Sequence, residues 1–595
     1  MRSLSEAQFL ELSNSTINLG CPRDLLECGI FEGISHKDAS KLGGSLYELY
    51  KTKGAEFANE WLSDSIERIK LLDSVSVMRP HVEKEAERQA KRGGKSGNKK
   101  ALLWLRTVVS RLRYCDTLIT DLTGEELAAW TEKKSAHFEK TFFDLGLSEG
   151  KQKAKKFMAE SLKAAGVEFD KWDETDKVVS MAARMITPEW WARQAKKQWR
   201  TVENILRECG EVHNGASPYL SRWGLNKFRK QQEANEAFLK GWEAENQHGE
   251  KFTLEDLANR SVSNPFIRRG ELMGRIRGTE ELAVELGNVG YFLTLTAPSK
   301  YHAVRKSGSR VSKFYDAACP TPRESQAYLC NVWAKIRAQA KREEIHFYGI
   351  RVVEPHHDAT PHWHIMVFGE AGQMANFVEI FKAYAMEEDA DEKGADDARY
   401  DVTFMNPAEG TAAGYIAKYI CKSIDGSHIE KDLETGKSAA DMAENITGWA
   451  RRHGIRQFQF FGSASVTVWR ELRLLKKDIS EKIRPIYDAA NDGQWKEYTK
   501  LMGGFCAGRN QTLKPYYSDT EENQYGELCA SIKGVSLGIE TFVTRFYDWT
   551  LQRVGAGSVS VTGSLSKRTE NPFSRTRVNN CTPPSGGGNY QPIYQ

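Results

Sequence analysis

Hydrophobic positions in the first 280 residues recur at the spacing of amphipathic helices. Residues 101–119 and 187–209 mix apolar and charged side chains with a helical period. Pro188 follows Thr187 directly, which is typical of a helix N-cap and a first-turn proline. The basic run 84–100 ends in Gly, Ser and Asn, so we interpret it as an exposed, solvated linker, with DNA-backbone contact as the alternative. This part of the chain is predicted to be mostly helical.

The pattern changes near residue 285, where short runs of aromatic and β-branched residues begin. Such runs are typical of strands, and helical patterns separate them. The predicted strands are 291–297, 346–355, 362–369 and 400–405, and the predicted helices are 325–344, 373–388 and 410–424. This order indicates a central antiparallel sheet with flanking helices, an α+β fold. A further strand or loop at 455–462 leads into a predicted helix at 466–483.

The 595 residues are enough for about two to four domains. The predicted parts are an N-terminal helical segment at 1–80, a helical region at 81–284, the α+β domain at 285–483, a C-terminal helical region at 484–550 and a flexible tail at 551–595. The tail is assigned from its composition, which shifts to Gly, Ser, Thr, Pro and Asn.

Composition and charge exclude several classes of protein. Lys and Arg number 84 against 80 Asp and Glu, and this net charge of +4 is too small to indicate nucleic acid by itself. The 10 cysteines include no C-x-x-C pair, so neither a zinc ribbon nor a disulfide framework is supported. Charges interrupt every apolar run before the roughly 20 residues that a membrane span needs, and the N-terminus has no apolar signal region. We expect a soluble protein that stays inside the cell.

The clearest candidate for chemistry is EPHHDATPHWH, residues 354–364. In a strand, His362 and His364 point to the same side because successive side chains alternate faces. A hairpin with its apex near Asp358 would set Glu354 opposite His362 on that side. Two imidazoles and one carboxylate suit a catalytic divalent ion, so these three residues are the predicted metal ligands. The other polar residues of the hairpin are rival third ligands: His356, His357 and Asp358.

A second candidate is GYIAKYICK, residues 414–422. In a helix, Tyr415 and Tyr419 lie one turn apart, with Lys418 and Lys422 on the same stripe. A different, apolar face can dock on the sheet through Ile416, Ile420 and Ile424. Tyrosine is a poor nucleophile at its free pKa of about 10, and a neighbouring cation favours the phenolate and stabilises charge developing on a phosphate. Taken alone, the pattern also fits an ordinary amphipathic helix with interfacial tyrosines.

A basic stretch follows the first predicted strand. Its cations are interleaved with Tyr301 and Phe314, and this mixture suits a nucleic-acid backbone with unstacked bases. The candidate DNA contacts are Lys300, Arg305, Lys306, Arg310 and Lys313. A solvated loop explains the same pattern equally well, and the basic helix pattern at 468–477 is equally ambiguous.

Two common catalytic motifs are absent from the sequence. The chain has no G-x-x-x-x-G-K-[ST]; in the GKS at 436–438, for example, Lys431 stands where the first glycine should be. It also has no H-E-x-x-H. We therefore predict neither a P-loop motor nor a metalloprotease of that type.

Together, these motifs resemble those of the HUH superfamily of rolling-circle replication endonucleases. His362-Trp363-His364 resembles the His-hydrophobic-His motif, Tyr415-x-x-x-Tyr419-x-x-Lys422 resembles the two-tyrosine motif, and 292–299 resembles the first motif. With its flanking segments, the chain is similar to the bacteriophage replication gene A protein family over roughly residues 80–480; these flanks are 184–194, 264–278 and 448–462. The resemblance implies that the α+β domain is an HUH endonuclease with an RRM-like core. One departure is Ala359, which stands in the hairpin turn where glycine would be the easier choice.

By this resemblance, the protein nicks one strand of a phage replication origin. A divalent ion, Mg²⁺ or Mn²⁺, on the two histidines and Glu354 would polarise the scissile phosphate. Tyr415 or Tyr419 would attack, leaving a 5′-phosphotyrosyl bond and a free 3′-OH that primes rolling-circle synthesis. The phosphotyrosyl bond would allow the strand to be rejoined later without ATP. Lys418 and Lys422 would stabilise charge, and Lys422 matches the family pattern.

The partners implied are origin DNA and a host helicase, single-strand-binding protein and DNA polymerase, in the cytoplasm of a bacterial host and with no membrane. The helical region at 81–284 is a candidate for binding origin DNA. The alternatives are a two-tyrosine HUH transposase or relaxase, a non-catalytic DNA-binding protein whose histidines are structural, and a metallohydrolase of small phosphoesters.

Overall fold

The computed structural model describes residues 35, 38, 42, 45, 49, 52–75, 78–92, 94–112, 122, 124–305, 315–406, 408, 410–427, 429–432, 435–475 and 479–555. The chain divides into two compact units. Unit 1 comprises 1–123, 142–169 and 193–211, and unit 2 comprises 124–141, 170–192 and 212–595. The predicted tail at 551–595 begins too early, because a strand continues to Arg553, and from residue 556 onwards the tail lies outside the described residues. Within the described part of the chain, no helix combines the length and the apolar character that crossing a bilayer requires.

Unit 1 is helical in its described residues, as the sequence predicts. Its helices are α4 (Ala55–Asp73), α5 (Arg79–Arg92), α6 (Gly97–Leu112), α8 (Lys151–Ala164) and the greater part of α10 (Pro188–Glu208). The predicted start of α10 at Pro188 is confirmed. The predicted linker at 84–100 is wrong, because α5 continues to Arg92 and α6 begins at Gly97. Both helices bury small and branched residues among their charges, such as Val82 and Leu105.

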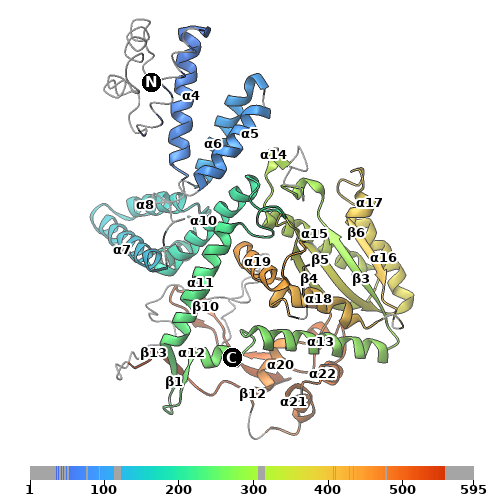
Figure 1. Ribbon diagram of the computed structural model, residues 1–595. Coiled ribbons are helices and arrows are strands. Elements are labelled where there is room, and N and C mark those ends of the chain that lie inside the picture. The colour runs from blue at the N-terminus through green and yellow to red at the C-terminus, as the bar shows by residue number, and fades with distance from the viewer. Residues whose placement is uncertain are drawn as a thin grey trace. The chain divides into compact units, whose positions relative to one another are not determined.

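Unit 2 contains a five-stranded antiparallel sheet, which confirms the predicted α+β fold (Figure 1). Across the sheet the strands are β6 (Tyr400–Phe404), β3 (Val289–Thr296), β5 (Pro361–Gly369), β4 (Phe347–Pro355) and β7 (Phe458–Phe461). Along the chain, α15 (Pro322–Arg342) connects β3 to β4, and α16 (Ala371–Ala385) connects β5 to β6. This connectivity is a β-α-β-β-α-β unit with one additional strand.

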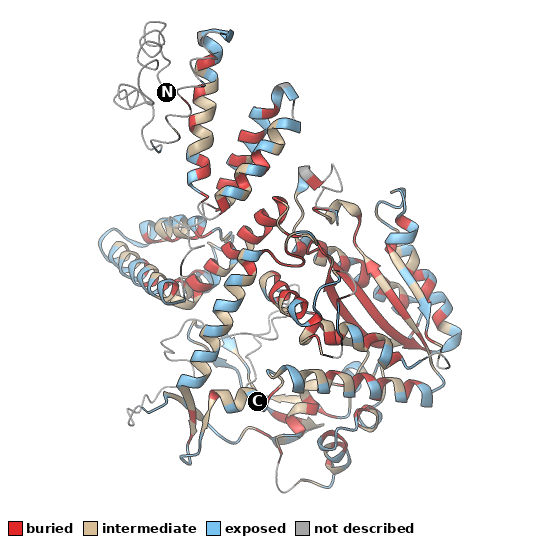
Figure 2. Ribbon diagram, viewed as in Figure 1, coloured by how far each residue is buried: buried red, intermediate tan, exposed pale blue. Residues whose placement is uncertain are grey.

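Helices cover both faces of the sheet, so β4 and β5 are buried over most of their length (Figure 2). On one face α15 and α16 pack against the odd-numbered residues of β5: Trp363, Ile365 and Val367. On the other face, α13 (Pro265–Glu285) and α18 (Ala412–Ile424) pack against Met366 of β5. His362 and His364 continue this second face toward the hairpin end of the strand.

The β4–β5 hairpin has the predicted register. Glu354 pairs with His362 and Pro355 with Pro361. Asp358 is buried at the turn, where its side chain accepts hydrogen bonds from the backbone N–H of Thr360 (3.1 Å) and Ala303 (2.9 Å). Ala359 has a φ of 70°, so the turn does use the left-handed conformation for which glycine would be easier.

The other helices of unit 2 come before, between and after these strands in the chain. They are α9 (Thr175–Met185), α11 (Arg222–Gly241), α12 (Leu254–Asn259), α14 (Tyr315–Ala318), α17 (Ala395–Ala398), α19 (Ala439–His453), α20 (Val466–Leu472), α21 (Arg484–Asn491) and α22 (Trp495–Leu501). α7 (Gly124–Ser148) contributes residues to both units. The predicted helix at 466–483 is too long, because α20 ends at Leu472.

The predicted C-terminal helical region at 484–550 is wrong beyond Leu501. The chain there forms β8 (Lys514–Tyr517), β9 (Glu521–Glu522), β10 (Leu528–Cys529), β11 (Ile532–Leu537), β12 (Glu540–Val543) and β13 (Trp549–Arg553). Gly538 has a φ of 59° in the two-residue turn between β11 and β12, a signal of a hairpin in the sequence. β13 pairs with β1 (Trp242–Asn246), and β1 pairs with β2 (Lys251–Thr253), so the helical region at 81–284 also contains strands.

Trp363 anchors the face of β5 opposite the histidines. Its side chain is fully buried, its indole N–H donates to Gln326 (3.0 Å), and the guanidinium of Arg351 lies 3.9 Å from its ring centroid. We expect Trp363→Ala to lower the free energy of unfolding by about 3–5 kcal/mol, because it empties a large volume of the core. Urea denaturation followed by circular dichroism measures this loss.

Ile539→Ala is the matched control, because Ile539 is fully exposed. It is expected to change the free energy of unfolding by less than about 0.5 kcal/mol. If Trp363→Ala lowered the free energy of unfolding no more than Ile539→Ala, the packing of Trp363 in the core would be contradicted.

Candidate active site

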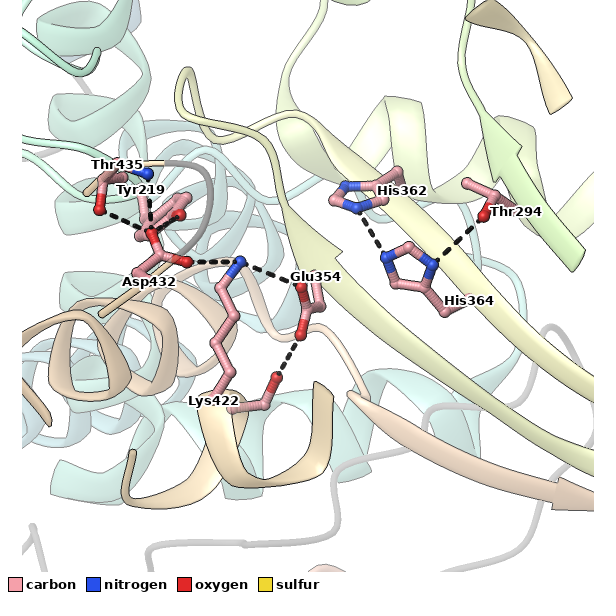
Figure 3. A network of polar contacts seen from close by, with 9 residues as sticks. Tyr219, Thr294, Glu354, His362, His364, Lys422, Asp432 and Thr435 are labelled. Carbon is pink, nitrogen blue, oxygen red and sulfur yellow. Dashed lines mark hydrogen bonds and ion pairs between the residues drawn. The ribbon is translucent and has the colours of Figure 1, made fainter. Parts of the chain in front are cut away.

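Three potential metal ligands converge next to the turn of the β4–β5 hairpin (Figure 3). Among the described residues, one ligand atom each from Glu354, His362 and His364 lies within 4.8 Å of the others, and all three residues are buried. The Nε2 atoms of the two imidazoles are 3.0 Å apart. The register of β4 and β5 produces this group, because Glu354 is directly opposite His362 and His364 is two residues along on the same face.

The surroundings of both imidazoles favour their neutral form. Burial lowers the pKa of His364 to about 3, and Lys422 and His356 contribute in the same direction. Burial also holds the pKa of His362 well below its ordinary value. Neutral imidazole is the form that binds metals, because a ring nitrogen then offers its lone pair.

The geometry of this group fits a divalent cation. Two nitrogen ligands about 2.1 Å from one ion lie about 3.0–3.4 Å apart, which matches the separation of the Nε2 atoms. The Nδ1 atom of His364 lies 3.3 Å from the hydroxyl of Thr294, which can fix the tautomer that leaves Nε2 free. Nδ1 of His362 is buried with no hydrogen-bond partner in the described residues. Glu354 supplies the carboxylate that would complete a two-nitrogen, one-oxygen set.

The rival third ligands have other places in the hairpin. Asp358 holds the turn through backbone N–H groups and lies 3.4 Å from Nδ1 of His302. The ring of His356 stacks on that of His362, with centroids 4.1 Å apart. The carbonyl of His357 accepts a hydrogen bond from the N–H of Tyr219 (3.2 Å). The structure therefore brings Glu354, rather than these residues, into the group with the two histidines.

Helix α18 carries both tyrosines over the same face of the sheet. It begins after Thr411, whose hydroxyl caps the N–H of Gly414, and Ile416 and Ile420 are buried as the predicted docking face. Tyr415 and Tyr419 are half-buried at the edge of this apolar cluster.

Tyr419 lies directly against the candidate metal ligands. Its ring stacks on His364 with centroids 3.8 Å apart and on Phe292 at 5.6 Å. The ring of Tyr415 is 6.3 Å from Phe292. Both phenols are thus on the face that carries the histidines, with Tyr419 the nearer of the two rings to His364.

The two lysines of α18 have different surroundings. Lys418 is exposed, and its ammonium lies 4.7 Å from the ring centroid of Tyr419. The ammonium of Lys422 lies between two carboxylates, 3.2 Å from Glu354 and 3.0 Å from Asp432. Lys418 is therefore the lysine of α18 that lies over the ring of Tyr419, whereas Lys422 is a largely buried cation.

Only two of the five candidate DNA contacts, Lys300 and Arg305, belong to the described residues. Lys306, Arg310 and Lys313 lie outside the described residues. Arg305 is exposed, whereas Lys300 forms ion pairs with Glu388 and Asp389. Burial alone would lower the pKa of Lys300, but these carboxylates outweigh it and raise the pKa. To contact a DNA phosphate, Lys300 would have to break its ion pairs with Glu388 and Asp389.

Several residues near the site were not among the predicted site residues. Ser423 donates to Glu354 (3.2 Å), Tyr219 donates to Asp432 (2.6 Å), and Thr294 and Phe292 flank His364. Tyr219 and Asp432 lie far apart in the chain and in no recognised motif, so only the folded structure reveals their contact. Phe292 and Thr294 could be found from the alternation of β3, which places both on one face.

Known proteins similar to this chain are phage replication proteins. Residues 136–427 match the family described as bacteriophage replication gene A protein (GPA). The replication gene A protein of Escherichia phage 186 is 40% identical over 428 residues, which cover 68% of this chain and 60% of that protein. The replication gene A protein of Escherichia phage P2 is 38% identical over 435 residues, or 69% of this chain and 56% of that protein.

A bacterial relative has a more specific name. The probable replication endonuclease from prophage-like region 2 of Salmonella typhi is 32% identical over 426 residues, which cover 67% of this chain and 52% of that protein. The chain thus spans little more than half the length of these relatives. No solved structure matches it.

Proposed function

The chain belongs to the bacteriophage replication gene A protein family, and from this premise we propose that it is a site-specific endonuclease that nicks one strand of a phage replication origin and initiates rolling-circle replication. The observation that carries the proposal is the stacking of Tyr419 on His364, one of three buried residues that can ligate one cation. A phosphodiester placed there would meet a Lewis acid and a phenol nucleophile at the same time.

The proposed reaction is a transesterification at phosphorus. The phenol oxygen of Tyr415 or Tyr419 attacks the scissile phosphate in line, the bond from phosphorus to the 3′ oxygen breaks, and the strand stays attached through a 5′-phosphotyrosyl ester. The phenol proton leaves to solvent, and the departing 3′ oxygen takes up a proton to become a free 3′-OH. A Mg²⁺ or Mn²⁺ ion held by His362, His364 and Glu354 would supply charge stabilisation to the phosphate.

The remaining residues of α18 have supporting parts in this proposal. Lys418, near the ring of Tyr419, favours the phenolate because a cation stabilises the charged form. A second tyrosine one turn away permits a second transesterification while the first still holds DNA. Because the phosphotyrosyl ester conserves the energy of the broken bond, rejoining needs no ATP.

The proposed HUH assignment is supported by the β-α-β-β-α-β order of β3 to β6 and by two histidines on the central strand. The partners proposed are origin DNA, a host helicase, a single-strand-binding protein and a DNA polymerase, in the cytoplasm of a bacterial host. A separate helicase is proposed because the sequence has no P-loop motif.

The test is incubation of the full chain with supercoiled DNA carrying its own coding region, with Mn²⁺ or with EDTA. We expect one strand to be nicked at one position with Mn²⁺ only, and the 3′ end to be extended by a polymerase without further treatment. Binding that is indifferent to EDTA and leaves the DNA intact would instead favour a non-catalytic DNA-binding protein. Turnover of a model phosphodiester without any DNA adduct would favour a metallohydrolase.

A further inference from the structure

A buried network of polar contacts extends from Glu354 away from the histidines (Figure 3). The ammonium of Lys422 joins the carboxylates of Glu354 and Asp432, at 3.2 and 3.0 Å. The side chain of Lys422 is 13% exposed, and those of Glu354 and Asp432 are 2% and 0% exposed. A cation and two anions at this depth interact strongly because little water screens them.

Asp432 is itself held in place by three donors. The hydroxyl groups of Tyr219 and Thr435 each donate to its Oδ2 atom at 2.6 Å, and the backbone N–H of Thr435 lies 3.2 Å away. Burial alone would raise the pKa of Asp432, but Lys422 and these hydroxyls outweigh it and keep the pKa low. Asp432 is therefore a fixed negative charge opposite Glu354.

Tyr219 connects this network of polar contacts to the turn of the β4–β5 hairpin. Its backbone N–H donates to the carbonyl of His357 (3.2 Å), and its hydroxyl reaches Asp432. Its φ is 71°, a conformation that costs a bulky residue on the order of 1 kcal/mol or more and that persists only where surrounding contacts fix it. The ring is completely buried. One tyrosine thus ties the segment before α11 to both the hairpin turn and Asp432.

The sharing of Lys422 between two carboxylates affects what Glu354 can bind. Glu354 already accepts from Ser423 at Oε1 and from Lys422 at Oε2. With Glu354 as its only acidic partner, the Lys422 ammonium would neutralise that carboxylate and compete with a metal cation for it. Because the Lys422 ammonium also pairs with Asp432, the group of Glu354, Lys422 and Asp432 keeps one net negative charge beside the two imidazoles.

We propose that Asp432 and Tyr219 are positioning residues that hold Lys422 away from full pairing with Glu354, so that Glu354 stays available to a divalent cation. The proposal rests on the proposed function for the identity of the metal ligands. It assigns Lys422 a role in the metal site rather than at the phosphate. It also links metal binding to α18, the helix that carries Tyr415 and Tyr419, because Lys422 and Ser423 of that helix both donate hydrogen bonds to Glu354.

The test is the Mn²⁺ affinity of the full chain, measured by electron paramagnetic resonance without DNA. We expect Asp432→Asn to weaken Mn²⁺ binding about 10-fold or more, the range found when partners of metal ligands are removed. Tyr219→Phe, which removes one hydroxyl, is expected to weaken it by a smaller factor. The matched control is Asp425→Asn, because Asp425 lies in the same segment after α18 but pairs with Arg269. It should leave the affinity unchanged.

A second readout separates positioning from a merely structural role. Excess Mn²⁺ should restore most of the nicking rate of Asp432→Asn, because only the metal requirement has risen. If Asp432→Asn does not fold, as judged by circular dichroism, Tyr219→Phe decides the question.

The outcomes distinguish this inference from the proposed function. Parental Mn²⁺ affinity in folded Asp432→Asn, or in Tyr219→Phe where only that variant folds, would overturn the inference, as would a nicking loss that excess Mn²⁺ leaves in place. A parent chain that binds Mn²⁺ in an Asp432-dependent manner but nicks no DNA would overturn the proposed function alone. A parent chain that binds no Mn²⁺ would overturn both.

Discussion

Replacing both tyrosines of α18 with phenylalanine is expected to abolish the covalent protein–DNA adduct. Tyr415→Phe/Tyr419→Phe keeps both rings, and so keeps the stacking on His364 and Phe292, but removes the two oxygens that can attack phosphorus. Loss of the nucleophile removes the covalent route entirely, so nicking should fall by about 10⁴-fold or more. Denaturing gel electrophoresis of labelled origin DNA after incubation with Mn²⁺ measures both adduct and nick.

The single variants and one control make this result specific. Tyr384→Phe changes a tyrosine of α16, on the opposite face of the sheet, and should form adduct at the parental rate. The single variants Tyr415→Phe and Tyr419→Phe identify the tyrosine that attacks first, because only its loss removes the initial adduct. An adduct of undiminished yield in the double variant would place the nucleophile elsewhere in the chain.

The second large effect is expected at the metal ligands. His364→Ala removes one of the two nitrogens that lie 3.0 Å apart, and a divalent ion then keeps only His362 and Glu354. Because the ion's stabilisation of a phosphate is worth several kcal/mol, we expect nicking to fall by about 10³-fold. The Mn²⁺ dependence of the nicking rate measures the change, and Mn²⁺ affinity should weaken in parallel.

His346→Ala is the control for this variant, because His346 is an exposed residue just before β4. It should leave both the nicking rate and the Mn²⁺ requirement unchanged. Parental nicking by His364→Ala in Mn²⁺, or by the parent chain in EDTA, would show that the histidines serve only the fold.

The sheet and the hairpin were predictable because local patterns specify them. The alternation of β5 places His362 and His364 on one face and Trp363 on the other, and the short turn fixes which residue of β4 faces each of them. The apolar stripe of α18 likewise fixes which side of the helix meets the sheet, and therefore on which side Tyr415 and Tyr419 emerge.

The contacts that depend on distant segments could not be predicted in this way. Asp432 and Tyr219 are more than 200 residues apart, and no local pattern indicates that they meet at Lys422. The same limit applies to Lys300, which the basic pattern presents as a DNA contact but which the fold pairs with Glu388 and Asp389. Charge patterns describe composition, whereas ion pairs depend on tertiary structure.

The C-terminal part was mispredicted for a different reason. The segment after Leu501 forms short strands, and runs of this length carry weak periodic signals. Short turns join β9 to β10 and β11 to β12. Gly526 and Gly538, both with positive φ, are the residues that mark those two turns. Glycines at such positions favour hairpins over helices.

The central claim is that a phenol of α18 attacks a phosphate held at the Glu354, His362 and His364 group. Mass-spectrometric mapping of the DNA-modified peptide, after reaction of the parent chain with origin DNA and Mn²⁺, tests it most directly. We expect a nucleotide 5′-phosphate to be attached to Tyr415 or Tyr419. Attachment at any other residue, or nicked DNA with a free 5′-phosphate and no modified peptide, would contradict it.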